Sequence, residues 1–362
     1  MQFIDLKAQY RHIQADVDSR MKQVLAHGQF LMGPEVTELE SRLAKYTGAK
    51  HCVALSSGTD ALMMALMAQD IGEGDEVITS PFSFIATASM IKMVGATPVF
   101  VDIDPKTYNI NPALITDAIT PKTKAILPVN LYGQCADYDQ IRAIAQAHGL
   151  SIIEDAAQSF GATYRGKQSC TLGTIGCTSF FPSKPLGCYG DGGACFTDDD
   201  ALALKMSQIR NHGQDRRYHH IYLGVNARMD TLQAAVLLAK LDIFNDELQH
   251  RAQVATWYKE ALSHIPDVTL PYVDSNGTSV FAQYTISLDN RDGLAEKLAA
   301  QQIPTAVHYP LPINQQPIFS EKSKTIFVHS DEAAKRVLSL PFHPYLEKDS
   351  VQKIADAIAA AL

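Results

Sequence analysis

Short apolar runs alternate with amphipathic segments along the first half of the chain. Helix-like segments occupy residues 59–69, 84–94 and 137–148. The apolar runs around them are CVAL (52–55), EVIT (76–79), PVFV (98–101), KAILPV (124–129) and LSIIE (150–154). Runs of this length without polar alternation are typical of strands that are buried on both faces. Their alternation with helices predicts a mostly parallel sheet with helices on its two faces.

Two amphipathic helices are expected before the first of these strands. In residues 11–27 the apolar positions recur at helical spacing, and Gly28 follows as a stop signal. A second helix carries Pro34 in its first turn and ends at Gly48. The sheet is therefore expected to begin only after a helical N-terminal segment.

The pattern changes after residue 175. Closely spaced strand-like pieces between 176 and 197 surround a glycine-rich loop, Gly187 to Gly193, and a long helical stretch covers 229–264. The remaining elements are a strand at 280–288 and helices at 292–301 and 349–361. We predict an α/β chain with a large domain over residues 1–245 and a smaller α+β domain over residues 246–362.

Composition and charge exclude several classes of protein. Of the 362 residues, 46% are apolar and 19% are charged, which is enough apolar material for a sizeable core. The formal net charge of −8 argues against general nucleic-acid binding. No apolar run approaches the ~20 residues of a membrane span, and the first residues lack the apolar core of an export signal. We therefore expect a cytoplasmic protein with neither a nucleic-acid nor a membrane partner.

The cysteines give no sign of a metal site. No pair has the C-x2-C spacing that is typical of zinc ligands, so no metal is expected. Reduced thiols in the cytoplasm are the simplest interpretation. The six residues are Cys52, Cys135, Cys170, Cys177, Cys188 and Cys195.

The first candidate for chemistry is SSGTDAL, residues 56–62, which follows a predicted strand and opens a predicted helix. Its backbone N–H groups and hydroxyls would lie at the positive end of that helix, which suits a phosphate. An ordinary capped helix start explains the same residues, with Ser57 or Thr59 as the N-cap and Gly58 easing the turn. Taken alone, the segment favours the cap.

The second candidate is Asp155, in IIEDAAQSFGA (152–162). It lies at the carboxyl end of an apolar strand, where ligands of open α/β sheets bind. Packing does not explain an acid there, since a buried carboxylate is costly without a partner. The alternative is an N-cap for a following helix, and this segment alone does not decide between the two.

The third candidate is Lys184, whose apolar neighbours are Phe180, Phe181, Pro182, Pro185 and Leu186. Desolvation disfavours an ammonium ion, so such a lysine loses its proton more readily. The neutral amine can then form a Schiff base with a carbonyl. A surface lysine whose stem lies over apolar neighbours is the alternative.

The combination is more informative than any one part. A phosphate cradle, an aspartate at a strand end and a desolvated lysine match the needs of pyridoxal phosphate. The aldehyde of this cofactor needs an amine, its phosphate needs N–H and hydroxyl donors, and its ring nitrogen needs an anion. We therefore predict pyridoxal 5′-phosphate as the cofactor.

The chain as a whole resembles the DegT/DnrJ/EryC1/StrS family of pyridoxal-phosphate sugar aminotransferases, a branch of the aspartate-aminotransferase fold (fold type I). The resemblance covers essentially the whole length. It is carried by the segments FIDLKAQY, GQFLMGPEVTELE, SSGTDAL, EDAAQSFGA, SFFPSKPLGCYGDGGA, RNHGQDRRYHH, GVNARMDTLQAA and TAVHYPLP.

The resemblance implies roles for four residues around the cofactor ring. Lys184 would be the Schiff-base lysine and the base that moves the proton. Asp155 would pair with the ring nitrogen, and Gln158 would hydrogen-bond the ring hydroxyl. Phe84 would stack on the ring, although plain core packing also explains a phenylalanine there. Some relatives carry histidine at the lysine position and act as dehydratases, so Lys184 favours amino transfer.

The resemblance also implies how the phosphate is held. Gly58, Thr59 and Ser179 would bind it from one chain, and Asn226 would reach it from the partner subunit of a homodimer with shared active sites. A satisfied strand hydroxyl is the alternative for Ser179.

Within the family, RNHGQDRRYHH and TAVHYPLP resemble the enzymes that aminate C3 of a UDP-linked 2-acetamido-3-keto-hexuronic acid for surface polysaccharides such as O-antigen. L-Glutamate is the usual donor. Basic side chains suit the diphosphate and carboxylate of such a substrate, although a solvated loop explains 210–220 as well. The implied substrate-binding residues are His212, Arg216, Arg228, His308 and Tyr309.

Three competing hypotheses remain at this point. The nearest is a C4 aminotransferase of a UDP- or dTDP-4-keto-hexose. A nicotinamide-dependent oxidoreductase is weakened because residues 51–62 lack G-x-G-x-x-G. A non-catalytic binding protein on the same fold is weakened by the intact set of Lys184, Asp155 and Gln158.

Overall fold

The structure is a computed structural model that describes residues 1–320 and 325–362. Its centre is a seven-stranded sheet in the order β1-β9-β8-β5-β4-β2-β3. The pairs β2/β3, β2/β4, β4/β5 and β5/β8 are parallel, and β9 is antiparallel to both of its neighbours. The strands are β1 (His51–Leu55), β2 (Glu76–Thr79), β3 (Thr97–Phe100), β4 (Thr123–Leu127), β5 (Ser151–Asp155), β8 (Ile175–Ser179) and β9 (Gly193–Thr197). The predicted α/β class with a mostly parallel sheet is confirmed.

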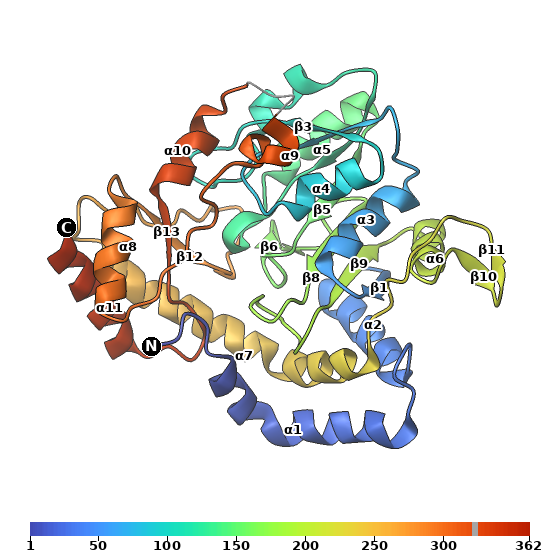
Figure 1. Ribbon diagram of the computed structural model, residues 1–362, viewed down its shortest axis with the longest axis horizontal. Coiled ribbons are helices and arrows are strands. Elements are labelled where there is room, and N and C mark those ends of the chain that lie inside the picture. The colour runs from blue at the N-terminus through green and yellow to red at the C-terminus, as the bar shows by residue number, and fades with distance from the viewer. Residues whose placement is uncertain (321–324) are drawn as a thin grey trace.

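Helices cover both faces of this sheet (Figure 1). Val53 and Leu55 of β1 pack with α3, α4 and α6, whereas Cys52 and Ala54 pack with α2 and α7. This alternation is expected for a strand that is buried on both sides. The helices are α1 (Leu6–His27), α2 (Pro34–Thr47), α3 (Gly58–Ala68), α4 (Ala86–Met93), α5 (Tyr138–His148), α6 (Asp200–Ile209), α7 (Thr231–Leu262), α8 (Arg291–Ala300), α9 (Pro317–Ser320), α10 (Val328–Arg336) and α11 (Lys348–Ala361).

The C-terminal part lies beside the sheet, at the left of Figure 1, and α7 runs along the base from one part to the other. The first half of α7 packs in the cluster that contains Phe244, and its second half packs with Tyr258 against β12, β13, α8 and α11. One helix thus belongs to two hydrophobic cores. The domain limits 1–245 and 246–362 stay a prediction.

Short strands and 3-10 turns complete the described chain. The strands are β6 (Thr163–Tyr164), β7 (Lys167–Gln168), β10 (Gln214–Arg216), β11 (His219–His220), β12 (Tyr284–Ser287) and β13 (Val337–Leu340). The turns are η1 (Pro112–Leu114), η2 (Thr116–Ala118), η3 (Leu131–Gly133) and η4 (Ile313–Gln315). Among the helices of the described residues, none is long and apolar enough to cross a bilayer.

Two boundaries differ from the sequence prediction by more than two residues. α1 starts at Leu6 rather than near residue 11, because the carboxylate of Asp5 accepts the N–H of Ala8 and caps the helix. The predicted strand 280–288 is confirmed only for 284–287. Its first residues instead hydrogen-bond to the loop at Gly133, where Val280 N donates to the Gly133 carbonyl oxygen.

Candidate active site

A cavity of about 460 Å³ opens where the parallel strands end. This is the edge of an open α/β sheet at which ligands bind. Segments that follow β1, β2, β4, β5 and β8 supply its walls, and residues near 283 and 308 close it from the C-terminal part. The predicted site residues that line it are Gly58, Thr59, Phe84, Asp155, Gln158, Ser179, Lys184, His308 and Tyr309.

One end of the cavity is the N-terminus of α3. Ser57 is the N-cap, and its Oγ accepts the N–H of Asp60 at 3.0 Å. Gly58 and Thr59 form the first turn, whose N–H groups have no acceptor within the helix. A Cβ on Gly58 would lie 2.5 Å from the Cβ of Ser179, so only glycine permits this approach. The helix cap and an anion cradle therefore coexist in the same residues.

Asp155 ends β5 and is 4% exposed. Its Oδ2 accepts the hydroxyl of Thr87 at 2.9 Å, and its Oδ1 accepts the N–H of Ala157 at 3.2 Å. No helix follows: residues 157–161 form turns, so the N-cap alternative is wrong. Burial raises the pKa of Asp155, and the two hydrogen bonds and the charge of Lys184 oppose that rise. A cation placed at this carboxylate would favour its ionised form.

Lys184 follows β8 in a turn that is closed by its N–H and the carbonyl oxygen of Phe181, at 2.8 Å. Its side chain is partly buried and lines the cavity. Burial lowers the pKa of Lys184, and the nearby Asp155 opposes that shift. Within residues 1–320 and 325–362 its Nζ has no hydrogen-bond or ion-pair partner. The lysine therefore presents a weakened base to the cavity rather than a solvated ammonium on the surface.

Gln158 has a fixed orientation. Its Oε1 accepts the backbone N–H of Tyr132 at 2.8 Å, and its Nε2 donates to the hydroxyl of Tyr309 at 3.1 Å. The amide nitrogen therefore faces the cavity, and its second N–H, which has no acceptor in the described part of the chain, is available to a ligand oxygen.

Phe84 stands at the rim of the cavity with 54% of its surface exposed, whereas Phe82 is 1% exposed. The core-packing alternative is thus wrong for Phe84. Its ring centroid lies 6.3 Å from that of Tyr309. Two aromatic rings therefore flank the opening.

His308 reaches the cavity from the C-terminal part. Its Nδ1 lies 2.8 Å from the hydroxyl of Ser339. Burial, together with the charge of Lys184, lowers the pKa of His308 to about 4. This imidazole is therefore neutral at physiological pH.

The other predicted residues lie outside the cavity lining. Asn226 is exposed, and Arg228 donates from Nη1 to Oδ1 of Asn211 at 3.0 Å. Arg216 lies exposed on β10, and the carbonyl oxygen of His212 bonds to Nδ1 of His220 at 2.8 Å. The β10–β11 hairpin projects from the body at the right of Figure 1. A single chain does not bring these four residues to the cavity.

Sequence reasoning missed three neighbours of the site: Ser57 lines the cavity, Thr87 bonds to Asp155, and Tyr132 bonds to Gln158. Ser57 was identified only as a possible cap. Thr87 lies 68 residues before Asp155, and no local pattern links the two.

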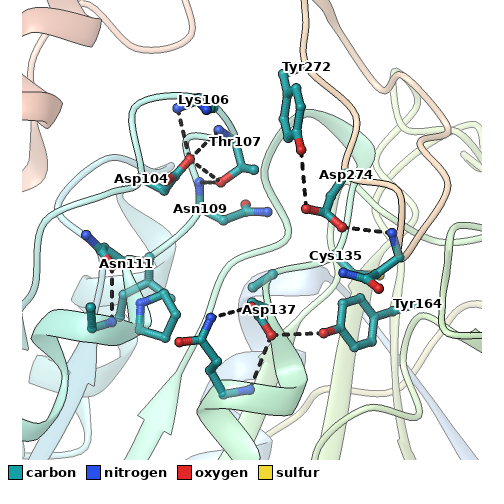
Figure 2. A pocket seen from close by; sticks show the side chains of 16 residues that line it. Asp104, Lys106, Thr107, Asn109, Asn111, Cys135, Asp137, Tyr164, Tyr272 and Asp274 are labelled. Atoms are coloured by element: carbon teal, nitrogen blue, oxygen red, sulfur yellow. Dashed lines mark hydrogen bonds between the residues drawn. The ribbon is translucent and has the colours of Figure 1, made fainter.

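A second cavity of about 350 Å³ lies elsewhere and holds none of the predicted residues (Figure 2). Its carboxylates form hydrogen bonds with neighbouring groups of the chain. Asp104 accepts the N–H groups of Lys106 and Thr107, Asp137 accepts the hydroxyl of Tyr164, and Asp274 accepts the N–H of Asn276. These bonds explain the acidic groups as loop and helix caps.

Comparison with known proteins places the chain among sugar aminotransferases. The DegT/DnrJ/EryC1/StrS aminotransferase family matches residues 11–359. The chain is 55% identical over 358 residues to UDP-2-acetamido-2-deoxy-3-oxo-D-glucuronate aminotransferase of Pseudomonas aeruginosa, covering 99% of each. It is 44% identical to UDP-N-acetyl-3-dehydro-alpha-D-glucosamine 3-aminotransferase of Acidithiobacillus ferrooxidans, covering 99% of this chain and 97% of that one.

Among solved structures, NtdA from Bacillus subtilis with bound cofactor PMP superposes with a TM-score of 0.90 at 34% identity. The match covers 99% of this chain and 83% of that one. The cavity described above fits such a cofactor: Gly58 leaves an anion cradle beside Ser179, Asp155 is a buried acid, and the amine of Lys184 has no partner among the described residues. The cavity thus offers one matching group each to the phosphate, the ring nitrogen and the reactive carbon of such a cofactor.

Proposed function

Since this chain belongs to the DegT/DnrJ/EryC1/StrS aminotransferase family, we propose that it transfers an amino group from L-glutamate to C3 of a UDP-linked 2-acetamido-3-keto-hexuronic acid. The chain is an enzyme of the transaminase class and depends on pyridoxal phosphate. The observation that carries the substrate assignment is the 55% identity, over 99% of both chains, with a UDP-3-oxo-glucuronate aminotransferase.

Four residues would hold the cofactor at its two ends. Gly58 and Thr59, in the first turn of α3, offer N–H groups to the phosphate, and Ser179 adds a hydroxyl beside them. Asp155 offers a carboxylate to the ring nitrogen, held in place by Thr87. When bound, the cofactor supplies an aldehyde that takes up the amino group and a protonated ring that draws electrons from the reacting bond.

The chain's own groups handle the protons. Nζ of Lys184 would hold the cofactor at its reactive carbon. Once the incoming amine has displaced it, the freed Nζ would take and return the proton that amino transfer moves, because burial lowers its pKa. The carboxylate of Asp155 would keep a proton on the ring nitrogen of the bound cofactor. His308 is neutral, since its pKa is about 4, and therefore adds no charge beside Lys184.

Gln158 and Phe84 would position the ring. One N–H of Gln158 Nε2 has no acceptor within residues 1–320 and 325–362 and is available to the ring hydroxyl, whereas the other N–H and the amide oxygen are already hydrogen-bonded. Phe84 supplies an exposed aromatic face at the rim of the cavity.

The active site is proposed to be shared between two copies of the chain. The support is the division found in one copy: Asn226, Arg228, Arg216 and His212 lie outside the cavity that the other predicted residues line. Nε of Arg228 is buried and has no partner among the described residues, so a ligand group or a second copy would satisfy it. In a homodimer these residues would face the cavity of the neighbouring copy.

The substrate proposal is supported by the chemistry of these residues. A UDP-linked uronic acid carries a diphosphate and a carboxylate, and guanidinium groups bind both in bidentate fashion. The C4 alternative is not favoured, because the two relatives described above are named for their action on a 3-oxo and a 3-dehydro sugar.

The place of the reaction is part of the same proposal. A nucleotide sugar with an amino group at C3 is a precursor for surface polysaccharide such as O-antigen. The six cysteines are free thiols, which suits a reducing compartment, and we therefore place the enzyme in the cytoplasm.

Substrate profiling tests the proposal. The purified enzyme, with L-glutamate, is offered the 3-keto uronic acid and the matched 3-keto sugar that carries a hydroxymethyl group in place of the carboxylate. We expect kcat/KM to be roughly 100-fold higher for the uronic acid, because an arginine that pairs with the carboxylate would be left unpaired by the neutral sugar. Equal values for the two sugars, or faster reaction of a 4-keto-hexose, would contradict it.

A further inference from the structure

We propose that Tyr132 is a positioning residue that holds Gln158 and the His308–Tyr309 segment in one arrangement around the cavity. The inference rests on the proposed function, because Gln158 is assigned there to the cofactor. The family resemblance implies His308 and Tyr309 as substrate-binding residues. Tyr132 itself lies outside the cavity lining.

The contacts form a closed ring. The backbone N–H of Tyr132 donates to Oε1 of Gln158 at 2.8 Å, and Nε2 of Gln158 donates to the hydroxyl of Tyr309 at 3.1 Å. The hydroxyl of Tyr132 donates to the carbonyl oxygen of His308, the residue that precedes Tyr309. Tyr132 thus contacts both Gln158, which follows β5 of the sheet, and His308, which belongs to the C-terminal part.

Tyr132 adopts a backbone conformation that L-residues rarely occupy. Its φ is 57°, in the left-handed region, within the 3-10 turn η3. Such a conformation costs free energy and persists only where its surroundings hold it. Here it aims the N–H at Gln158 while the side chain, 9% exposed, reaches His308.

The turn that carries Tyr132 is anchored on both sides. Before Tyr132, the N–H of Asn130 donates to the carbonyl oxygen of Asp155 at 3.0 Å, and the N–H of Leu131 donates to Oδ1 of Asn109 at 2.8 Å. After Tyr132, the carbonyl oxygen of Gly133 accepts the N–H of Val280 at 2.9 Å, and a Cβ on Gly133 would lie 2.7 Å from the backbone nitrogen of Phe281. The turn is therefore fixed to the strand end that carries Asp155.

This closed set of hydrogen bonds couples cofactor binding by Gln158 to the position of Tyr309. Gln158 cannot turn its amide over, because the NH2 group would then face the N–H of Tyr132. Its donor must point toward Tyr309 and the cavity, and the backbone of His308 is held by the same Tyr132. The hydrogen bond to the cofactor hydroxyl and the position of Tyr309 are therefore set jointly, and loss of the Tyr132 hydroxyl loosens both.

The test compares Tyr132→Phe with Tyr258→Phe. Tyr258 is a matched control, because its hydroxyl donates to the carbonyl oxygen of Pro341 at 2.7 Å in the buried C-terminal core, away from the cavity. We expect Tyr132→Phe to raise the dissociation constant of pyridoxal phosphate and the KM for the keto sugar about fivefold each, since one hydrogen bond is lost. Tyr258→Phe should lower the melting temperature and leave both constants unchanged.

A double-mutant cycle adds the second measurement. If the ring acts as a unit, Tyr132→Phe combined with Tyr309→Phe weakens cofactor binding no more than the worse single variant does. Additive effects, or a Tyr132→Phe enzyme that matches Tyr258→Phe in both constants, would overturn the proposal.

A variant that fails to fold does not end the test. Tyr309→Phe alone breaks the link to Gln158, so hydrogen exchange at the Tyr132 amide should become about fivefold faster than in the wild type. An unchanged exchange rate would overturn the proposal. The cofactor and exchange measurements need no sugar, so a wrong substrate assignment appears separately, as a wild-type enzyme that binds cofactor and ignores the uronic acid.

Discussion

The hydroxyl of Thr87 donates to Oδ2 of Asp155 at 2.9 Å, and 68 residues separate them in sequence. Thr87 is 1% exposed and Asp155 is 4% exposed, so the carboxylate is shielded from water. The hydrogen bond from Thr87 is the main polar contact that replaces this water inside the chain. The acid that should pair with the cofactor ring is thus fixed at the sheet edge in the cofactor-free protein. Burying this carboxylate lowers the free energy of unfolding of that protein.

The first prediction follows from that cost. Burial raises the pKa of Asp155 above its unfolded value, so the stability it contributes is present at low pH and is lost as the pH rises through the folded pKa. In the cofactor-free protein, Asp155→Asn should therefore gain stability relative to the wild type between pH 4 and pH 7.5. Melting temperatures of the two apo proteins across this range measure the difference.

Asp137 is the matched control, with the opposite sign. Burial raises its pKa, but hydrogen bonds from Gln140 and Tyr164 outweigh burial and hold the pKa of Asp137 below its usual value. Asp137→Asn should therefore lose stability relative to the wild type as the pH rises from about 2 to 5, where this carboxylate ionises. Parallel slopes for the two variants would contradict the account of Asp155.

The second prediction concerns the phosphate cradle. Gly58→Ala places a Cβ 2.5 Å from the Cβ of Ser179, so the start of α3 must move away from it. We expect the dissociation constant of pyridoxal phosphate to rise about tenfold or more, because overpacking of this kind costs ~1–3 kcal/mol. Gly72→Ala is the control, since the nearest atom to its added Cβ is 3.5 Å away. Similar cofactor affinity in both variants would argue against the cradle.

The third prediction concerns His308. Its pKa is lowered to about 4, below the unfolded value, so the stability it contributes is present above pH ~6.5 and is lost as the pH falls toward 4. His308→Asn should flatten the acid side of the plot of melting temperature against pH. The exposed His264 provides the control variant His264→Asn. An unchanged acid side in His308→Asn would show that this imidazole is not buried as described.

The fourth prediction tests the shared site. A mixture of Asn226→Ala and Lys184→Ala proteins, each without useful activity, should regain up to about a quarter of wild-type activity after subunit exchange, because one site in each hybrid dimer is intact. Activity is followed with L-glutamate and the keto sugar. No recovery, with exchange verified by mass, would place Asn226 in the same chain's site.

The large sheet was predictable from sequence because its strands are short apolar runs with helices between them, and β1 to β5 lie within a residue or two of the predicted runs. The strand 280–288 was overestimated because its apolar residues bind a loop at Gly133 rather than a neighbouring strand. Such pairing depends on a partner about 150 residues away, which no local pattern reveals.

Some residues of the candidate site were likewise predictable from the sequence, and others were not. Lys184, Asp155 and Gly58 stand in segments whose local chemistry indicates them, and they line one cavity. Thr87 and Tyr132 act through single hydrogen bonds across 68 and 26 residues. Their side chains are ordinary threonine and tyrosine in apolar segments, so only the folded chain reveals their contacts.

The most direct test of the central claim is the visible absorbance of the purified enzyme during one cycle. The account predicts that the wild type shows the absorbance of bound pyridoxal phosphate, loses it on addition of L-glutamate, and regains it when the UDP-linked 3-keto uronic acid follows. Lys184→Ala should show no such cycle. A wild type whose absorbance never responds to L-glutamate, or a Lys184→Ala enzyme with full amino transfer, would contradict the account.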